Sequence, residues 1–163
     1  MVHFCVLVRR HLTLMGLVLF SGCCTDQYFT SSCGTLPSEQ VSAIEVTIRT
    51  GREATNADIY FCYDLLDSTT ANCQILDTSA NNFEEGRTEV FLVRADFDGQ
   101  TFDTFWIENR GGRIFEGDWD IDALTVTLRT ASGGSVLYDE PGIICNEAVN
   151  EGDTYSPGGC TWR

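Results

Sequence analysis

The sequence predicts a single disulfide-bonded, all-β domain built as an antiparallel sandwich. Apolar and polar residues alternate with a period of two in several short segments, and turn-forming residues separate those segments. No segment shows the 3.6-residue period of an amphipathic helix. The chain has 163 residues and eight cysteines. That length suits one domain, and in an exported chain of this size the cysteines favour disulfides.

Residues 1–22 differ from the rest of the chain and predict export. A basic stretch at 9–11 is followed by the apolar run 12–20 and then by two small residues. This order is typical of a cleaved signal peptide. The apolar run is too short for a permanent membrane span, which needs roughly 20 residues. A buried N-terminal helix would need a polar face, and the run shows none.

The signal ends in a sequence that suggests lipidation. Residues 20–23, Phe-Ser-Gly-Cys, resemble the lipobox of bacterial lipoproteins, which usually has Leu in place of Phe20. The resemblance implies that Cys23 becomes the acylated first residue, anchored at the bacterial cell envelope. Cys5 leaves with the signal, so six cysteines remain for disulfides: Cys24, Cys33, Cys62, Cys73, Cys145 and Cys160. The alternative is a soluble secreted protein with an unpaired Cys23.

The mature chain is strongly acidic and has no lysine. Its formal charge changes from −14 to −16 when Arg9 and Arg10 are removed with the signal. Such a surface repels nucleic acid and is not attracted to anionic lipid. We therefore expect no nucleic-acid partner.

The residue types also restrict catalysis. Both histidines, His3 and His11, lie in the segment that is removed. The mature chain then has no Ser-His-Asp or Cys-His system and no Schiff-base lysine. Zinc binding is not favoured, because no CxxC pair occurs. Carboxylate-based hydrolysis is the remaining class, but most of the acids are expected to be solvated, and we predict no enzymatic activity.

The expected strands follow one another from residue 41 onward. Ile44, Val46 and Ile48 alternate with polar residues and predict a half-buried first strand. Segment 88–95 is apolar on both faces, so we expect a central strand there. Residues 25–40, rich in Ser, Thr and Gly, predict a tether whose first part docks on the domain. The other strands are expected within 56–64, 73–76, 101–108, 119–129 and 135–138.

The alternation also predicts one disulfide. Phe61 and Tyr63 face inward in their strand, so Cys62 is expected on the outer face, and Leu76 places Cys73 outward on the next strand. Neighbouring antiparallel strands would bring the two cysteines within bridging distance. The remaining four would tie the tether to the C-terminal tail, in a pairing that the sequence leaves open.

A change of phase predicts a bulge in the strand at 119–129. Trp119 and Ile121 share one face, but the next apolar residue of that face is Leu124, an odd step away. Such a slip is typical of a β-bulge, here near Asp122-Ala123.

Over 41–140 the order of landmarks resembles the PLAT domain, the β-sandwich attached to lipoxygenases, some lipases and bacterial phospholipase toxins. The matching pieces are Thr-Gly at 50–51, Ala-Thr-Asn-Ala at 54–57, Phe-Glu-Glu-Gly at 83–86, and Trp119 with the aliphatic residues after it. The resemblance implies an eight-stranded sandwich; Gly86 is expected at positive φ. The chain then divides into a signal peptide (1–22), a lipidated tether (23–40), the sandwich (41–140) and a cysteine-containing tail (141–163).

Calcium is possible but not required. Asp118, Asp120 and Asp122 resemble the start of an EF-hand loop, but Ala123 and Arg129 replace its Gly and its final Glu. Some PLAT domains bind calcium at their loops, and that resemblance makes Asp118 a candidate ligand. A second locus would use Asn81, Asn82 and Glu84, whereas Arg52 stands where the first loop's acidic ligand is expected.

The resemblance implies a binding role. Phe115, between glycines, matches loop positions that insert apolar side chains into lipid; alternatively, Ile114 and Phe115 fold back over the sandwich. Trp106 and Trp119 are assigned to the core. We expect a non-catalytic lipoprotein that docks a membrane or an unidentified protein or lipid partner. Carbohydrate recognition by another kind of sandwich is the alternative, and carboxylate-dependent hydrolysis has little weight.

Replacing Cys23 tests the anchor. The wild-type chain is expected to be acylated at Cys23 and to partition into the detergent phase, and Cys23→Ala to leave an uncleaved or soluble form. Phase partitioning and mass spectrometry of the mature N-terminus measure both. A water-soluble mature chain that begins at another residue would contradict the lipoprotein interpretation.

Overall fold

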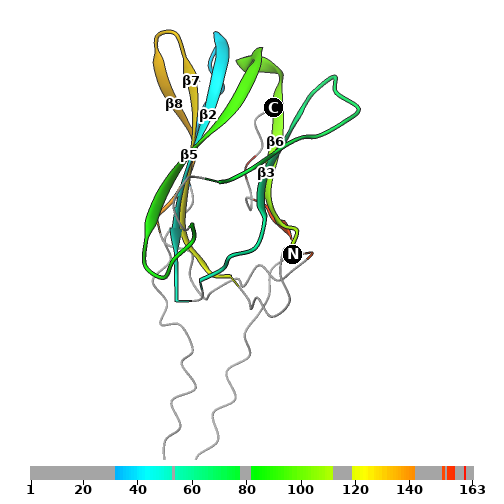
Figure 1. Cartoon of the computed structure of the whole chain (residues 1–163). Coiled ribbons are helices and arrows are strands. Elements are labelled where there is room, and N and C mark those ends of the chain that lie inside the picture. The colour runs from blue at the N-terminus through cyan, green and yellow to red at the C-terminus, as the bar shows by residue number, and fades with distance from the viewer. Residues whose placement is uncertain are drawn as a thin grey trace, which may run out of the picture.

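The computed structural model describes residues 32–52, 54–77, 82–111, 119–141, 152, 154–156 and 160. These residues form nine strands and one short 3-10 helix, and two antiparallel sheets pack face to face (Figure 1). In chain order the elements are β1 (Ser32–Cys33), β2 (Gln40–Thr50), β3 (Ile59–Leu65), β4 (Asn72–Ile75), β5 (Thr88–Asp98), η1 (Gly99–Thr101), β6 (Phe102–Asn109), β7 (Ile121–Thr130), β8 (Gly133–Glu140) and β9 (Thr154–Tyr155).

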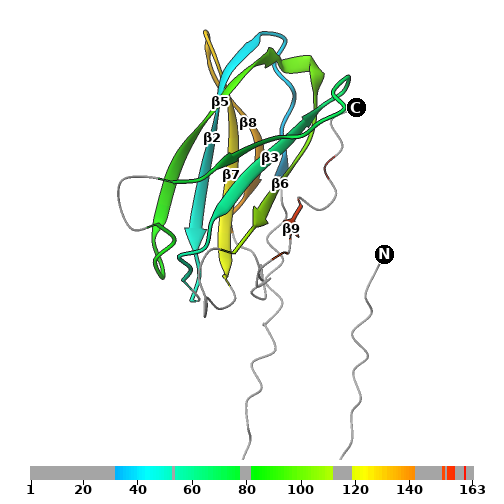
Figure 2. The same ribbon diagram turned by 45° about the vertical axis from the view of Figure 1, so that its right-hand side comes forward.

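The sheets contain five and four strands. The larger has the order β1-β8-β7-β2-β5, and the smaller has the order β4-β3-β6-β9 (Figure 2). The disulfide-bonded all-β sandwich is therefore confirmed. The described residues contain nine strands rather than the expected eight: seven of them, β2 to β8, correspond to the expected range 41–140, and the two-residue strands β1 and β9 lie outside it.

The core lies between the sheets and follows the period-two pattern. Alternate residues of β2 and β7 are fully buried and face the aromatic residues of the smaller sheet. Phe61 stacks on Phe105 with 5.4 Å between ring centroids, and Phe105 meets Tyr138 of the opposite sheet edge to face. These contacts make the interior strongly aromatic.

The bulge in β7 is where the change of phase predicts it. Arg49 lies opposite Ala123 but Thr50 lies opposite Ile121, so Asp122 is the extra residue. Ile121 and Leu124 can then both face the core. The Asp122 carboxylate forms an ion pair with Arg49 across the outer face of the sheet.

The two assigned core tryptophans have different positions. Trp119 is fully buried, as expected; its Nε1 donates to Thr50 Oγ1 at 3.4 Å, and its ring packs on Phe83 with centroids 4.8 Å apart. The assignment of Trp106 was wrong. Phe105 and Ile107 face the core, so Trp106 between them lies half-buried on the outer face, opposite Cys62.

β5 is an edge strand, so the expectation of a central strand at 88–95 was wrong. After β5 the chain turns at η1, where the Asp98 side chain accepts from the Gln100 N–H, and continues in the other sheet as β6. β6 therefore does not pair with the free edge of β5. The side chains of Val90 and Leu92, on the outer face of β5, are 56% and 64% exposed.

Two disulfides lie within the described residues. Cys62 and Cys73 are opposite one another on β3 and β4 and are bonded, with 4.1 Å between their Cα atoms. Closing this short loop contributes about 2–4 kcal/mol. Cys33 of β1 is bonded to Cys160, 127 residues later in the chain. Cys23, Cys24 and Cys145 lie outside the described residues.

A buried polar cluster joins the two sheets. Tyr138 of β8 and Tyr155 of β9 both donate hydrogen bonds to the Glu140 carboxylate. Burial, and then the hydrogen bond to Glu140, raise the pKa of Tyr155.

The described residues contain no helix with the length and apolar character needed to cross a bilayer.

The tryptophan pair provides a matched stability test. Trp119→Ala removes a fully buried indole and should lower the free energy of unfolding by roughly 3–5 kcal/mol. Trp106→Ala deletes the same group from the outer face and should cost only about 1 kcal/mol. Urea unfolding followed by circular dichroism gives both values. Equal losses would show that Trp119 does not have the core role described above.

Candidate functional site

Three connections meet at one end of the sandwich, which we call the loop end: residues 50–58, 76–87 and 109–120. Backbone hydrogen bonds join their described parts. The N–H of Gly51 donates to the carbonyl of Asp120 at 2.8 Å, and that of Thr55 to Phe83 at 3.2 Å. The loop end is thus a connected structure in its described part.

Gly51 is required by a close approach. A Cβ at this position would lie 2.9 Å from the Asp120 Cβ, a contact that side chains do not make. The Thr-Gly pair expected at 50–51 therefore brings the β2–β3 connection against Asp120. Gly86 has φ +69°, as expected, and its N–H donates to the carbonyls of Thr50 and Gly51 at 3.1 Å.

Asp120 is the most unusual acid of the loop end. It is 2% exposed, and its Oδ2 has no hydrogen-bond partner in the described part of the chain. A buried carboxylate oxygen without a donor is unfavourable unless it is protonated or meets a cation. Sequence reasoning used Asp120 only in the EF-hand test. The Asp-x-Asp-x-Asp spacing was the available signal, but burial could not be read from it.

The calcium ligands expected from the sequence either bond to other side chains or lie outside the described residues. Glu84 forms an ion pair with Arg87 at 2.7 Å, and the Asn82 amide donates to Asp77 at 2.9 Å. The calcium candidates Asp118 and Asn81 and the membrane-contact candidate Phe115 lie outside the described residues. The described loop end therefore offers a cation one buried oxygen, on Asp120, which fits calcium's preference for carboxylate ligands but is not a complete site.

A second group of polar and aromatic residues lies on the outer face of the smaller sheet. Arg110 Nη2 binds Glu108 Oε2 at 2.9 Å, and its guanidinium carbon lies 4.1 Å from the Tyr60 ring centroid. The hydrogen bond from Arg110 lowers the pKa of Glu108. Cys62, Cys73 and Glu108 are close enough together to bind a metal, but the disulfide removes both thiolates as ligands.

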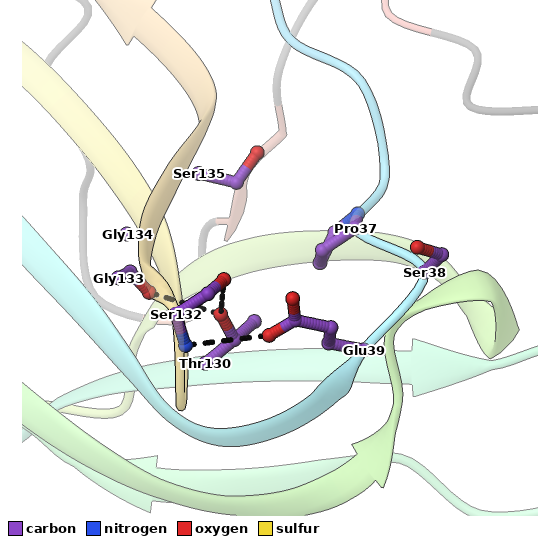
Figure 3. A pocket seen from close by; sticks show the side chains of 8 residues that line it. All are labelled: Pro37, Ser38, Glu39, Thr130, Ser132, Gly133, Gly134 and Ser135. Carbon is purple, nitrogen blue, oxygen red and sulfur yellow. Dashed lines mark hydrogen bonds between the residues drawn. The ribbon is translucent and has the colours of Figure 1, made fainter.

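A shallow pocket of about 230 Å³ lies at the opposite end, beside the β7–β8 turn (Figure 3). Its lining is mostly Ser, Thr and Gly, around the carboxylate of Glu39. The Ser132 N–H donates to Glu39 at 3.3 Å, and hydrogen bonds from Ser132 and Thr130 lower the pKa of Glu39. The pocket lacks the apolar lining typical of small-molecule sites.

Comparison with known proteins identifies the fold. No protein-family model and no curated protein matches the sequence. Among solved structures, alpha-toxin from Clostridium absonum matches 73% of this chain with TM-score 0.60 and 19% identity, and Clostridium perfringens alpha-toxin matches 73% with TM-score 0.61 and 20% identity. Coral 8R-lipoxygenase, whose structure is described with calcium activation via a C2-like domain, matches 60% with TM-score 0.43 and 20% identity.

The matching regions are C-terminal PLAT/C2-like domains in the toxins, so the fold of this chain is PLAT-like. The chain spans about a third of the toxin chains, 32% in each case. At this identity the similarity establishes the fold alone, and the toxins' activity is not transferred by it.

Asp120 provides the test of cation binding. Millimolar calcium should raise the melting temperature of the wild-type chain, because the ion binds the folded state only. Asp120→Asn should abolish the rise. Asp122→Asn, which changes a nearby carboxylate that is paired with Arg49, should retain it. Differential scanning fluorimetry with calcium and with chelator measures the shifts. A full calcium shift in Asp120→Asn would exclude Asp120 as a ligand.

Proposed function

We propose that the mature chain is a non-catalytic docking module, anchored to a membrane through acyl chains on Cys23, with its loop end towards that membrane. The observation that carries the proposal is the direction of β1. Ser32 lies opposite Asp139 and Cys33 opposite Tyr138, near the end of β8 that belongs to the loop end. The described chain therefore enters the sandwich at the loop end and runs away from it.

The length of the tether limits the distance to the membrane. Nine residues, 23–31, connect the acylated position to Ser32. Fully extended, they reach about 30 Å. The Cys33–Cys160 disulfide fixes the point where the tether joins the domain. The loop end is thus held near the bilayer, and the Glu39 pocket faces away from it.

The charge of the domain sets how it docks. At −16, the mature chain is repelled by anionic lipid, and one calcium ion would offset only two of those charges. The acyl chains on Cys23 therefore supply the membrane affinity in this proposal. Protein partners can then use the outer faces and sheet edges that point sideways.

Binding is favoured over catalysis by the groups present. Residues 23–163 contain no histidine or lysine. Glu84 of the loop end and Asp122, two residues beyond it in β7, are each paired with an arginine.

Carbohydrate recognition is supported less well. It would be favoured by a row of exposed aromatic rings on one outer face. Of the described aromatic residues, Tyr60 and Trp106 lie on such a face, but the Arg110 guanidinium covers the Tyr60 ring. A single half-buried Trp106 does not form a row.

Two labelled variants of the acylated chain test the orientation. Ala54 and Ala131 are both exposed, at the loop end and at the β7–β8 turn respectively. With Ala54→Cys or Ala131→Cys carrying a fluorophore, quencher lipids in vesicles should quench the label at 54 strongly and the label at 131 weakly. Equal quenching, or stronger quenching at 131, would refute the proposed orientation.

The same vesicles test the source of affinity. The chain with Cys23→Ala should not bind anionic vesicles at millimolar calcium, because its charge repels the surface and it lacks acyl chains. Co-sedimentation measures the bound fraction. Calcium-dependent binding that Phe115→Ala or Asp118→Asn abolishes would show instead that the loops bind lipid directly.

A further inference from the structure

One edge of the larger sheet is left uncovered in the described structure. β5 has eleven residues and pairs with β2 on one side, and no described strand pairs with its other side (Figure 2). The N–H of Arg94 donates to Gln74 Oε1 of β4 at 3.0 Å, so the backbone groups of Arg94 point away from β2. Because these directions alternate along a strand, Val90 and Leu92 also present theirs to the edge.

The side chains at this edge are apolar and exposed. Val90 and Leu92 are 56% and 64% exposed, the highest values for large apolar residues in the described chain. Natural edge strands are protected by lysine, proline, inward charges or bulges. Segment 88–93 contains no lysine or proline. Its one charge, on Glu89, lies on the inner face opposite Ile48 and accepts from the N–H of Phe83, so the outer face with Val90 and Leu92 has no such protection. A bulge interrupts the register with β2 only beyond Arg94.

The segment is complementary to itself. In an antiparallel pair centred on Phe91, Val90 lies opposite Leu92 of the partner subunit. The backbone groups of these residues would then exchange hydrogen bonds directly. On the outer face, Val90 and Leu92 of both copies would form one apolar cluster of four side chains, which cross-strand pairing stabilises. The two-fold symmetry closes the contact, so no further copy can add to it.

We propose that β5 pairs with β5 of a second copy of this chain, forming a continuous ten-stranded sheet across a two-fold axis. The contact is weak, because the paired segment is short and both copies carry a large negative charge. It therefore strengthens as salt screens the repulsion. The inference is independent of the lipid anchor and of the orientation proposed above.

Sedimentation velocity of the full chain tests the pairing. The wild-type chain should form dimers at tens of micromolar, and 500 mM NaCl should lower the dissociation constant several-fold relative to 50 mM. Leu92→Lys should weaken association at least tenfold. Val136→Lys is the matched control, because Val136 is 48% exposed on the same sheet but in β8, between β1 and β7. It should dimerise like the wild type.

A crosslink tests the register. Copies carrying Val90→Cys and copies carrying Leu92→Cys, once mixed and oxidised, should form a mixed disulfide faster than either variant forms one alone, since opposed Cα atoms lie about 5.5 Å apart. A wild-type chain that remains monomeric in both salts would overturn the proposal. So would a dimer that Leu92→Lys leaves intact, or one that both lysine variants dissociate equally.

Discussion

The buried indole of Trp119 joins the segments that form the loop end. Its ring packs on Phe83 of the β4–β5 connection, its N–H reaches Thr50 at the end of β2, and the residue after it is held by Gly51. Because Trp119 fills the end of the core, the three connections have fixed positions there, and the carboxylate of Asp120 is carried into the interior. The unusual electrostatics of the loop end therefore follow from a packing requirement.

Much of the fold could be predicted from alternation and turns, because burial of one face imposes a period of two. The bulge at Asp122 and the Cys62–Cys73 pairing followed from the same rule. The position of β5 did not, since periodicity reports how apolar a strand is and not which strands lie beside it. Trp106 was misassigned, because the inward-facing Phe105 and Ile107 on either side of it place it on the outer face. Asp120 was not recognised as a ligand candidate because its burial depends on the tertiary contact with Gly51.

Two surface properties of the domain oppose each other. The large negative charge keeps copies apart and away from anionic lipid. The apolar edge of β5 favours contact over a short segment. In the proposed pairing, apolar burial and backbone hydrogen bonds at this segment offset the repulsion between the two acidic copies. Such a balance makes the association responsive to ionic strength and to local concentration.

The Cys33–Cys160 bond determines how the domain carries mechanical load. Tension applied through the chain before Ser32 would first act on β1, which pairs with β8 over only two residues. The bond gives that tension a second covalent path, through Cys160 and towards β9 in the other sheet. The force would therefore be distributed over both sheets, and separation of β1 from β8 would not by itself start the unfolding of the larger sheet. Reduction of this one bond would leave the two-residue pairing of β1 with β8 to bear the tension alone.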